Sequence, residues 1–353
     1  MEATSPDPDY EQKPSSIYAN KTEHDKRIAE KLRRELGPQV CEWLVDPTVA
    51  EIMLNPDGSL WVEFLGGGME RMGTMPKAQA ESLMGTVASS LRRNITAENP
   101  ILECELPLDG SRFEAMVPPV VEGPTFTIRR KAVKVFTLDN YVESGIMTQA
   151  QCDVIKKAVC LRKNILVVGG TGTGKTTLTN AIIAYITEVH PHHRIIIIED
   201  TRELQSNSPN VVPLRAVEHV TQNDLLKATM RLRPDRILVG ECRDGSALAL
   251  LKAWNTGHPG GVATIHSNVE NGEDADGWIT WDAANESIDN SATAGLIRME
   301  QLVAEATQSP MQALIGEAVD LIVSIEKTAT SRRINDVIAV RGYNGTKYIT
   351  QSI

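Results

Sequence analysis

The strongest constraint on the fold is a glycine-rich segment that separates a buried strand from a helix. It follows the apolar run "NILVVG", precedes the helix-forming stretch "TTLTNAIIAYI", and reads Gly169-Gly170-Thr171-Gly172-Thr173-Gly174-Lys175-Thr176. A strand, a tight glycine loop and a helix in this order direct backbone N–H groups and the helix N-terminus at a phosphate. A plain turn does not need a lysine and a hydroxyl at its last two positions.

Each residue type in this segment has a physical role. The glycines let the backbone approach a phosphate closely, Lys175 reaches the β- and γ-phosphate oxygens, and the Thr176 hydroxyl is a ligand for Mg²⁺. We therefore predict a site for ATP or GTP with Mg²⁺. The residues assigned to the nucleotide here are Gly170, Thr171, Gly172, Thr173, Gly174, Lys175, Thr176 and Thr177.

The strand pattern divides the chain of 353 residues into two domains, in keeping with about 150 residues per domain. From about residue 147, apolar runs of strand length alternate with helical stretches, which predicts an α/β domain with a parallel sheet. These runs cover residues 165–168, 195–198, 237–239 and 262–265. We predict a disordered tail over 1–21, an α+β domain over 22–130, a linker over 131–146 and the α/β domain over 147–353.

The N-terminal domain is expected to be built from short elements. A first helix begins near Thr22 and stops at Gly37-Pro38, because this pair ends a helical pattern. The remaining elements are a hairpin around 50–64, a helix over 76–94, and strands near 111–117 and 125–129.

Acidic residues follow two of the predicted strands, at the edge where the glycine-rich segment lies. Glu199 ends the run "IIIIE" and Glu241 follows "RILVG". Since ligands bind at the carboxyl ends of parallel strands, one carboxylate can hold Mg²⁺ through water and the other can orient the attacking water. The nearby Asp200 and Glu203 are equally well explained as polar caps of a buried strand.

Two histidines belong to a third strand. His266 ends "GGVATIH" and His258 lies eight residues earlier. Without a third ligand this pair makes a poor metal site. They are either sensors of the γ-phosphate or structural residues.

Composition narrows the function classes. Lys and Arg total 36 and Asp and Glu total 46, so the formal charge is −10, and a basic nucleic-acid surface is not the first expectation. Five scattered cysteines with no C-x-x-C pair fit a reducing compartment. We expect no signal peptide and no membrane span.

Four ordered boxes carry a resemblance to a known family. The glycine-rich segment, "IIIIEDTREL", "MRLRPDRILVGECRDG" and "TGHPGGVATIHSN" resemble the Walker A, Asp, Walker B and His boxes of the type II/type IV secretion ATPases. The match is close to the conjugal transfer ATPases of the TrbB type and covers nearly the whole chain outside residues 1–21 and 269–290.

The resemblance implies a hexameric, ring-forming ATPase with a RecA-like P-loop C-terminal domain and a smaller N-terminal domain. Such rings use ATP and Mg²⁺ to power conjugative transfer, type IV secretion or pilus biogenesis at the cytoplasmic face of the inner membrane, with other machinery proteins as partners. Carried over by position, the catalytic residues are Glu241, Glu199, Lys175, Arg202 and His266, the metal residues are Thr176 and Glu241, and the further nucleotide-binding residues are Arg112, Arg129, Arg130 and His258. Glu241 stands where the family usually has an aspartate.

One stretch departs from the family pattern. Residues 269–290 look like an acidic insertion with seven Asp or Glu and no basic residue, so the rest of the chain carries only −3. An EF-hand reading fails, because Gly272 and Ala283 stand where calcium ligands are needed. We interpret the stretch as a solvated loop.

Two other functions stay open at this point. A RecA-like nucleic-acid motor would need a basic channel, and a nucleotide-gated scaffold would bind ATP without turnover. No sequence-specific nucleic-acid binding is expected.

Overall fold

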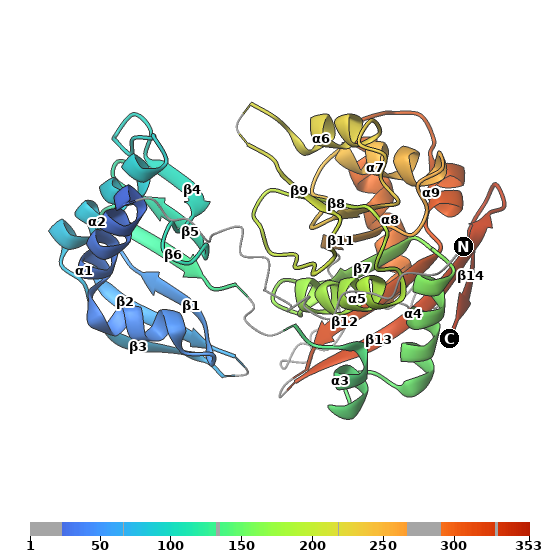
Figure 1. The fold of residues 1–353 in the computed structure, drawn as a ribbon, viewed down its shortest axis with the longest axis horizontal. Helices are drawn as coiled ribbons and strands as arrows, with labels where there is room; N and C mark the ends of the chain where they lie inside the picture. The colour runs from blue at the N-terminus through green and yellow to red at the C-terminus, as the bar shows by residue number, and fades with distance from the viewer. Residues whose placement is uncertain (1–22, 66, 132–134, 218, 267–290, 329–330) are drawn as a thin grey trace, which may run out of the picture. The chain divides into compact units, whose positions relative to one another are not determined.

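The computed structural model describes residues 23–65, 67–131, 135–217, 219–266, 291–328 and 331–353. The chain divides into two compact units, each with its own sheet (Figure 1). The first comprises the residues up to Val62 with Met69–Arg129, and the second comprises Glu63–Gly68 with Arg130–Ile353. The predicted tail, 1–21, and the predicted insertion, 269–290, lie outside the described residues.

The first unit is a sheet accompanied by two helices. The order of its six strands is β3-β2-β1-β6-β5-β4. The strands are β1 Val49–Leu54, β2 Ser59–Phe64, β3 Met69–Thr74, β4 Ile101–Glu105, β5 Arg112–Met116 and β6 Thr125–Arg129, and the helices are α1 Glu23–Val45 and α2 Lys77–Ser90. Because side chains alternate across a strand, Phe113 and Phe126 enter the core together, with ring centroids 5.7 Å apart.

The predicted elements of this unit are present, with additions. β1 and β2 confirm the hairpin, and α2, β5 and β6 confirm the other predicted elements. The helical path breaks at Gly37 (φ 81°, ψ 164°) as expected, but the helix resumes at Pro38, which suits the first position of a helix. β3 was not predicted because its residues are largely exposed and give no apolar alternation.

The second unit contains an eight-stranded sheet of order β14-β13-β12-β7-β11-β10-β8-β9. The strands from β12 to β9 run parallel, which confirms the predicted parallel arrangement, while β13 and β14 are antiparallel additions at one edge. The strands are β7 Ile165–Gly169, β8 Ile195–Glu199, β9 Val211–Arg215, β10 Arg236–Val239, β11 Val262–His266, β12 Leu321–Lys327, β13 Arg332–Tyr343 and β14 Tyr348–Ser352.

Helices cover both faces of this sheet, so the unit has three layers (Figure 1). The helices are α3 Leu138–Glu143, α4 Gln149–Cys160, α5 Lys175–Val189, α6 Gln222–Thr229, α7 Ser246–Asn255, α8 Ser291–Ala304 and α9 Gln312–Ala318. In β7, Ile165 and Val167 face the core under α3, α4 and α5, whereas Leu166 and Val168 face the core under α6 to α9. The strands are therefore buried on both sides, as their continuous apolar runs indicate.

Part of the segment expected as a linker is folded. Helix α3 lies within 131–146 and begins with a capping box between Thr137 and Asn140. Leu138 and Tyr141 from this helix are buried in the core of the second unit, because their apolar surface can pack against α4 and α5. No helix in the described ranges is long and apolar enough to cross a membrane.

Candidate active site

The glycine-rich segment forms the turn from β7 into α5. Gly172 (φ +71°) and Gly174 (φ +98°) adopt left-handed conformations that favour glycine, and Gly174 is the N-cap of α5. Thr173 is buried, and its Oγ1 donates a hydrogen bond to the Gly170 carbonyl at 3.0 Å. The glycines and one hydroxyl thus fix the loop around the helix N-terminus.

Lys175 lies buried within this loop, with only 7% of its surface exposed. Its Nζ donates to the carbonyls of Gly169 at 2.9 Å and Gly170 at 2.8 Å, and lies 3.2 Å from His266 Nδ1. An ammonium group can only donate, so Nδ1 accepts and the imidazole proton belongs on Nε2. That Nε2 lies 2.8 Å from Glu241 Oε1, so hydrogen bonds join Lys175, His266 and Glu241.

Both carboxylate oxygens of Glu241 have partners. Arg243 Nη2 donates to Oε2 at 2.8 Å, and Arg243 Nη1 lies 3.9 Å from Asp200 Oδ2. Burial raises the pKa of Glu241, but the hydrogen bonds from His266 and Arg243 and the charge of Arg243 outweigh it and lower the pKa to about 2. Glu241 is therefore an ionised carboxylate at neutral pH.

Glu199 occupies a different environment at the end of β8. It is 4% exposed, and its Oε1 accepts hydrogen bonds from the backbone N–H groups of Glu203 at 2.9 Å and Leu204 at 2.7 Å. Burial raises its pKa to about 7, and the two backbone bonds offset this only in part. A Cβ on Gly240 would lie 2.9 Å from Glu199 Cγ, so glycine at that position makes room for this side chain.

The loop after β8 is fastened to α5. Thr176 Oγ1 donates to Glu203 Oε2 at 3.1 Å. Asn180 holds the same loop, since its Oδ1 accepts from Gln205 N at 2.8 Å and its Nδ2 donates to the Glu203 carbonyl at 3.1 Å. Arg202 lies on this loop and is partly buried.

Sequence reasoning assigned no site role to Glu203, Asn180 or Arg243. The available signal was proximity along the chain: Glu203 lies four residues after Glu199, and Arg243 lies two residues after Glu241. Their contacts depend on how the loops turn after the strands, and residue spacing alone does not reveal that.

The structure does not bring His258 and His266 together. His258 precedes β11 and His266 ends it, so five residues of strand, about 16 Å, separate the two edges of the sheet that they occupy. At the edge before β11, Arg236 Nη1 donates to the Gly260 carbonyl at 2.7 Å, and Asn164 Oδ1 accepts from Gly260 N at 2.8 Å. Only His266 stands where the glycine-rich loop lies.

The predicted arginines of the first unit lie on neighbouring strands of its sheet. Arg112 begins β5, Arg129 ends β6, and the two are register partners. Arg112 Nη2 lies 2.7 Å from Glu103 Oε1, and Arg129 Nε lies 3.6 Å from Glu51 Oε1. Arg130 follows directly and belongs to the second unit. A role for all three toward phosphates stays a prediction.

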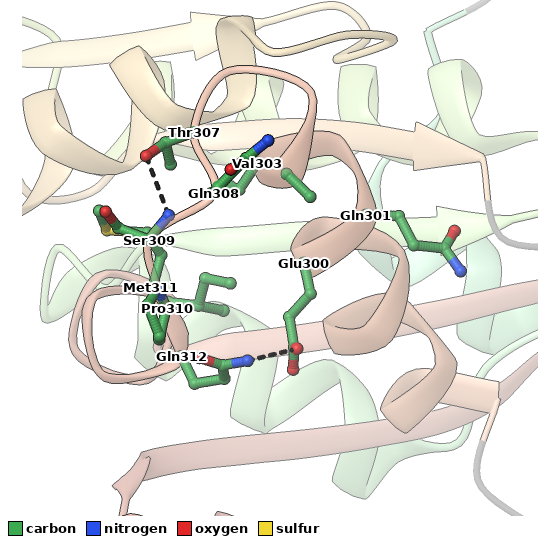
Figure 2. A pocket seen from close by; sticks show the side chains of 11 residues that line it. Glu300, Gln301, Val303, Thr307, Gln308, Ser309, Pro310, Met311 and Gln312 are labelled. Carbon is green, nitrogen blue, oxygen red and sulfur yellow. Dashed lines mark hydrogen bonds between the residues drawn. The ribbon is translucent and has the colours of Figure 1, made fainter.

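A separate cavity of about 400 Å³ lies at the connection from α8 to α9 (Figure 2). Gln312 Nε2 donates to Glu300 Oε2 at 2.8 Å at its side. The lining residues are Glu300, Gln301, Val303, Ala304, Thr307, Gln308, Ser309, Pro310, Met311, Gln312 and Ile315. This set includes none of the residues predicted from the sequence motifs.

Comparison with solved structures supports the fold. The pilus retraction motor PilT with bound ADP has a TM-score of 0.57 at 19% identity, over 89% of this chain and 81% of that one. The ATPase DotB of Legionella pneumophila has a TM-score of 0.56 at 18% identity, over 86% of this chain and 79% of that one. Both likenesses show a shared two-domain α/β fold.

Comparison with known sequences identifies the family. The conjugal transfer protein TrbB of Rhizobium radiobacter is 51% identical over 325 residues, which is 92% of this chain and 94% of that protein. The type IV secretion system protein VirB11 of Bartonella henselae is 32% identical over 276 residues, 65% of this chain and 75% of that protein. The family model described as "Type II/IV secretion system protein" matches residues 35–273. With these matches and the four boxes in place, the chain belongs to the type II/IV secretion system protein family.

Proposed function

We propose that this protein is a Mg²⁺-dependent ATPase that works as a hexameric ring in conjugative transfer or type IV secretion. The observation that carries the proposal is the hydrogen-bonded set of Lys175, His266 and Glu241 at the carboxyl edge of the sheet. The family supports ATPase activity, and relatives named for conjugal transfer and type IV secretion support the setting. We further propose a RecA-like C-terminal domain and a place at the cytoplasmic face of the inner membrane, beside other machinery proteins.

The contacts of Lys175 suit it to exchange partners with a phosphate. Its ammonium is shared between two loop carbonyls and His266, and a triphosphate in the loop would offer charged oxygens in their place. Hydrogen bonds to an ionised acceptor are stronger than those to a carbonyl, so the exchange is favourable. His266, which has 39% of its side chain exposed, would then be placed to sense the terminal phosphate.

The side chains at this end of the sheet carry the oxygen atoms that Mg²⁺ prefers as ligands, often through bound waters. They are the Thr176 hydroxyl, the Glu203 carboxylate that it contacts, and the Glu241 carboxylate beside His266. When bound there, Mg²⁺ neutralises charge that develops on the transferred phosphoryl group. Thr176 would hold the ion directly and the two carboxylates through water.

We assign the orientation of the attacking water to Glu241. Its side chain is 20% exposed and ionised, whereas Glu199 is 4% exposed and holds the loop after β8 through two backbone N–H groups. Glu199 is therefore the positioning residue of the pair. Arg202 and the arginines of the first sheet are further cations for the phosphates, acting by charge neutralisation.

The decisive experiment measures particle size and phosphate release together. The purified chain is sized by light scattering with ATP and either Mg²⁺ or EDTA, while released phosphate is assayed in the same samples. We expect a hexamer-sized particle that releases phosphate only with Mg²⁺. A monomer that releases none under any condition would overturn the proposal.

The same experiment separates the rival functions. ATP-dependent assembly without phosphate release would identify a nucleotide-gated scaffold. Strong stimulation of hydrolysis by DNA, lost on adding salt, would identify a nucleic-acid motor, because such binding is largely electrostatic.

A further inference from the structure

A second cation flanks the glycine-rich loop on the side opposite the acidic residues. Arg332 begins β13 and pairs across the hairpin with Lys327 of β12. A Cβ on Gly174 would lie 3.1 Å from Arg332 Cδ and 3.2 Å from Arg332 Nε. The side chain of Arg332 is therefore packed directly over the N-cap of α5.

The guanidinium of Arg332 is not neutralised there. Within the ranges that the structure describes, its Nε is enclosed and has no hydrogen-bond partner, and no carboxylate pairs with the side chain. Arg333 beside it on the same strand is different, since its Nε and Nη2 reach Glu326 Oε1 at 3.0 and 2.5 Å. Successive strand residues point to opposite faces, so only Arg332 is turned toward the loop.

A cation without an anion is unfavourable at this position. The N-terminus of a helix carries partial positive charge and unpaired N–H groups, so it attracts anions and repels a guanidinium. An enclosed donor with no partner adds a further cost. A phosphate that contacts the terminal nitrogens of Arg332 beside the N-terminus of α5 would supply the missing anion, because it accepts from the guanidinium and from the backbone N–H groups at once.

The order of the strands in the sheet indicates which phosphate of the nucleotide would lie beside Arg332. β11, β10 and β8, which end in His266, Glu241 and Glu199, lie on one side of β7, and β12 and β13 lie on the other. The proposed metal and water side of the site holds the terminal phosphate, so the opposite side faces the inner phosphates. We infer that Arg332 is a nucleotide-contacting residue that binds the inner phosphates common to ATP and ADP, an inference that rests on the proposed function.

The test compares nucleotide affinities across four proteins. Dissociation constants for ADP and for a non-hydrolysable ATP analogue are measured by calorimetry for the wild type, Arg332→Gln, Arg332→Lys and Arg333→Gln. The last variant is the matched control, because it removes the same charge from the next residue of the strand. Melting temperatures without nucleotide show that each variant is folded.

We expect Arg332→Gln to weaken ADP and the ATP analogue by the same factor, about 10- to 100-fold, and Arg332→Lys to recover part of the loss. Arg333→Gln should leave both affinities unchanged. Unaltered affinities in Arg332→Gln, or a loss confined to the ATP analogue, would overturn the inference. If the wild type bound neither nucleotide, the proposed function would fail, and this outcome is visible before any variant is compared.

Discussion

The parallel strands of the second sheet begin at one end, the amino edge, and finish at the other, the carboxyl edge. Each of these ends holds a buried cation beside a histidine, but the two cations have different partners. At the carboxyl edge, Lys175 Nζ lies 3.2 Å from His266 Nδ1. At the amino edge, Arg236 Nε donates to His193 Nδ1 at 3.1 Å, and Arg236 has no exposed surface. Residue types alone would make the two pairs equal candidates for a site.

The partners of each cation separate the two edges. The rest of the Arg236 guanidinium donates to the carbonyls of Gly260 at 2.7 Å and Val159 at 2.9 Å, which ties strand β10 to the loop before β11 and to helix α4. At the carboxyl edge, the imidazole beside Lys175 continues to the side chain of Glu241, which a ligand can displace without unfolding the backbone. A cation bound to backbone from several segments therefore stabilises the fold, whereas Lys175, which is bound to its own loop and to other side chains, is the candidate for a site.

The largest expected effect comes from removing the cation at the carboxyl edge. Lys175→Ala should lower kcat for ATP hydrolysis by about 10²- to 10³-fold, because a preorganised positive group at the phosphates is lost. Phosphate release by the folded variant measures this. Lys163→Ala is the control, since Lys163 lies at the amino edge in an exposed pair with Asp320 and should leave kcat unchanged. Hydrolysis at the wild-type rate in Lys175→Ala would contradict the assignment of the edge.

The second largest effect is a difference in kcat between variants of the two glutamates at the carboxyl edge. Glu241→Gln should lower kcat by about 100-fold while ATP still binds, because an amide lacks the negative charge and the second acceptor oxygen with which the carboxylate orients the attacking water. Glu199→Gln keeps an oxygen that accepts from Glu203 and Leu204, so it should lower kcat less than about tenfold. Single-turnover phosphate release on both variants makes the comparison. The reverse order would assign the attacking water to Glu199.

A substitution at the amino edge should lower the free energy of unfolding and leave kcat unchanged. Arg236→Leu leaves the carbonyls of Gly260 and Val159 without a donor, so the free energy of unfolding should fall by about 2 kcal/mol. Urea denaturation measures the loss, and Arg231→Leu at an exposed position of the preceding turn is the control. The folded fraction of Arg236→Leu should keep its kcat. A large loss of kcat at unchanged stability would place catalysis at the amino edge.

The sequence predicted β7, β8, β10 and β11 because each is buried on both faces and reads as a continuous apolar run. The inner strand β12 was not predicted, although it begins with a similar apolar run. Outer strands carry weaker signals: β9 contains Pro213, and β13 mixes charged and apolar residues along its length. α3 was missed for a related reason, because a helix of six residues gives too little periodicity to recognise.

The candidate site could also be predicted in part from the positions of residues relative to the strands. Residues that come directly after predicted strands, such as Glu199, His266 and Glu241, meet at one edge because parallel strands end together. His258 was grouped with them by the motif, but it comes before its strand and lies at the other edge. The position of Arg332 over Gly174 depends on a hairpin that returns from β12, which no local pattern could indicate.

The smallest expected effect is a pH dependence confined to the amino edge. Burial, together with the nearby charge of Arg236, lowers the pKa of His190 and of His193, and the two rings stack with centroids 4.3 Å apart. In the unfolded chain both titrate near 6.5, so as pH falls through about 6.5 the unfolded state binds protons first. This contribution to stability is therefore complete above that pH and is lost as the pH falls below it.

A pair of substitutions isolates this contribution from the other titrating groups. The double variant His190→Phe and His193→Asn keeps one aromatic ring and an acceptor for Arg236 but cannot gain a proton. Urea denaturation between pH 5 and pH 8 should show that the wild type loses stability relative to the double variant as the pH falls. His192→Asn, at an exposed position, should follow the wild type. If the difference between wild type and double variant were independent of pH, burial and the charge of Arg236 would not be holding the two histidines neutral.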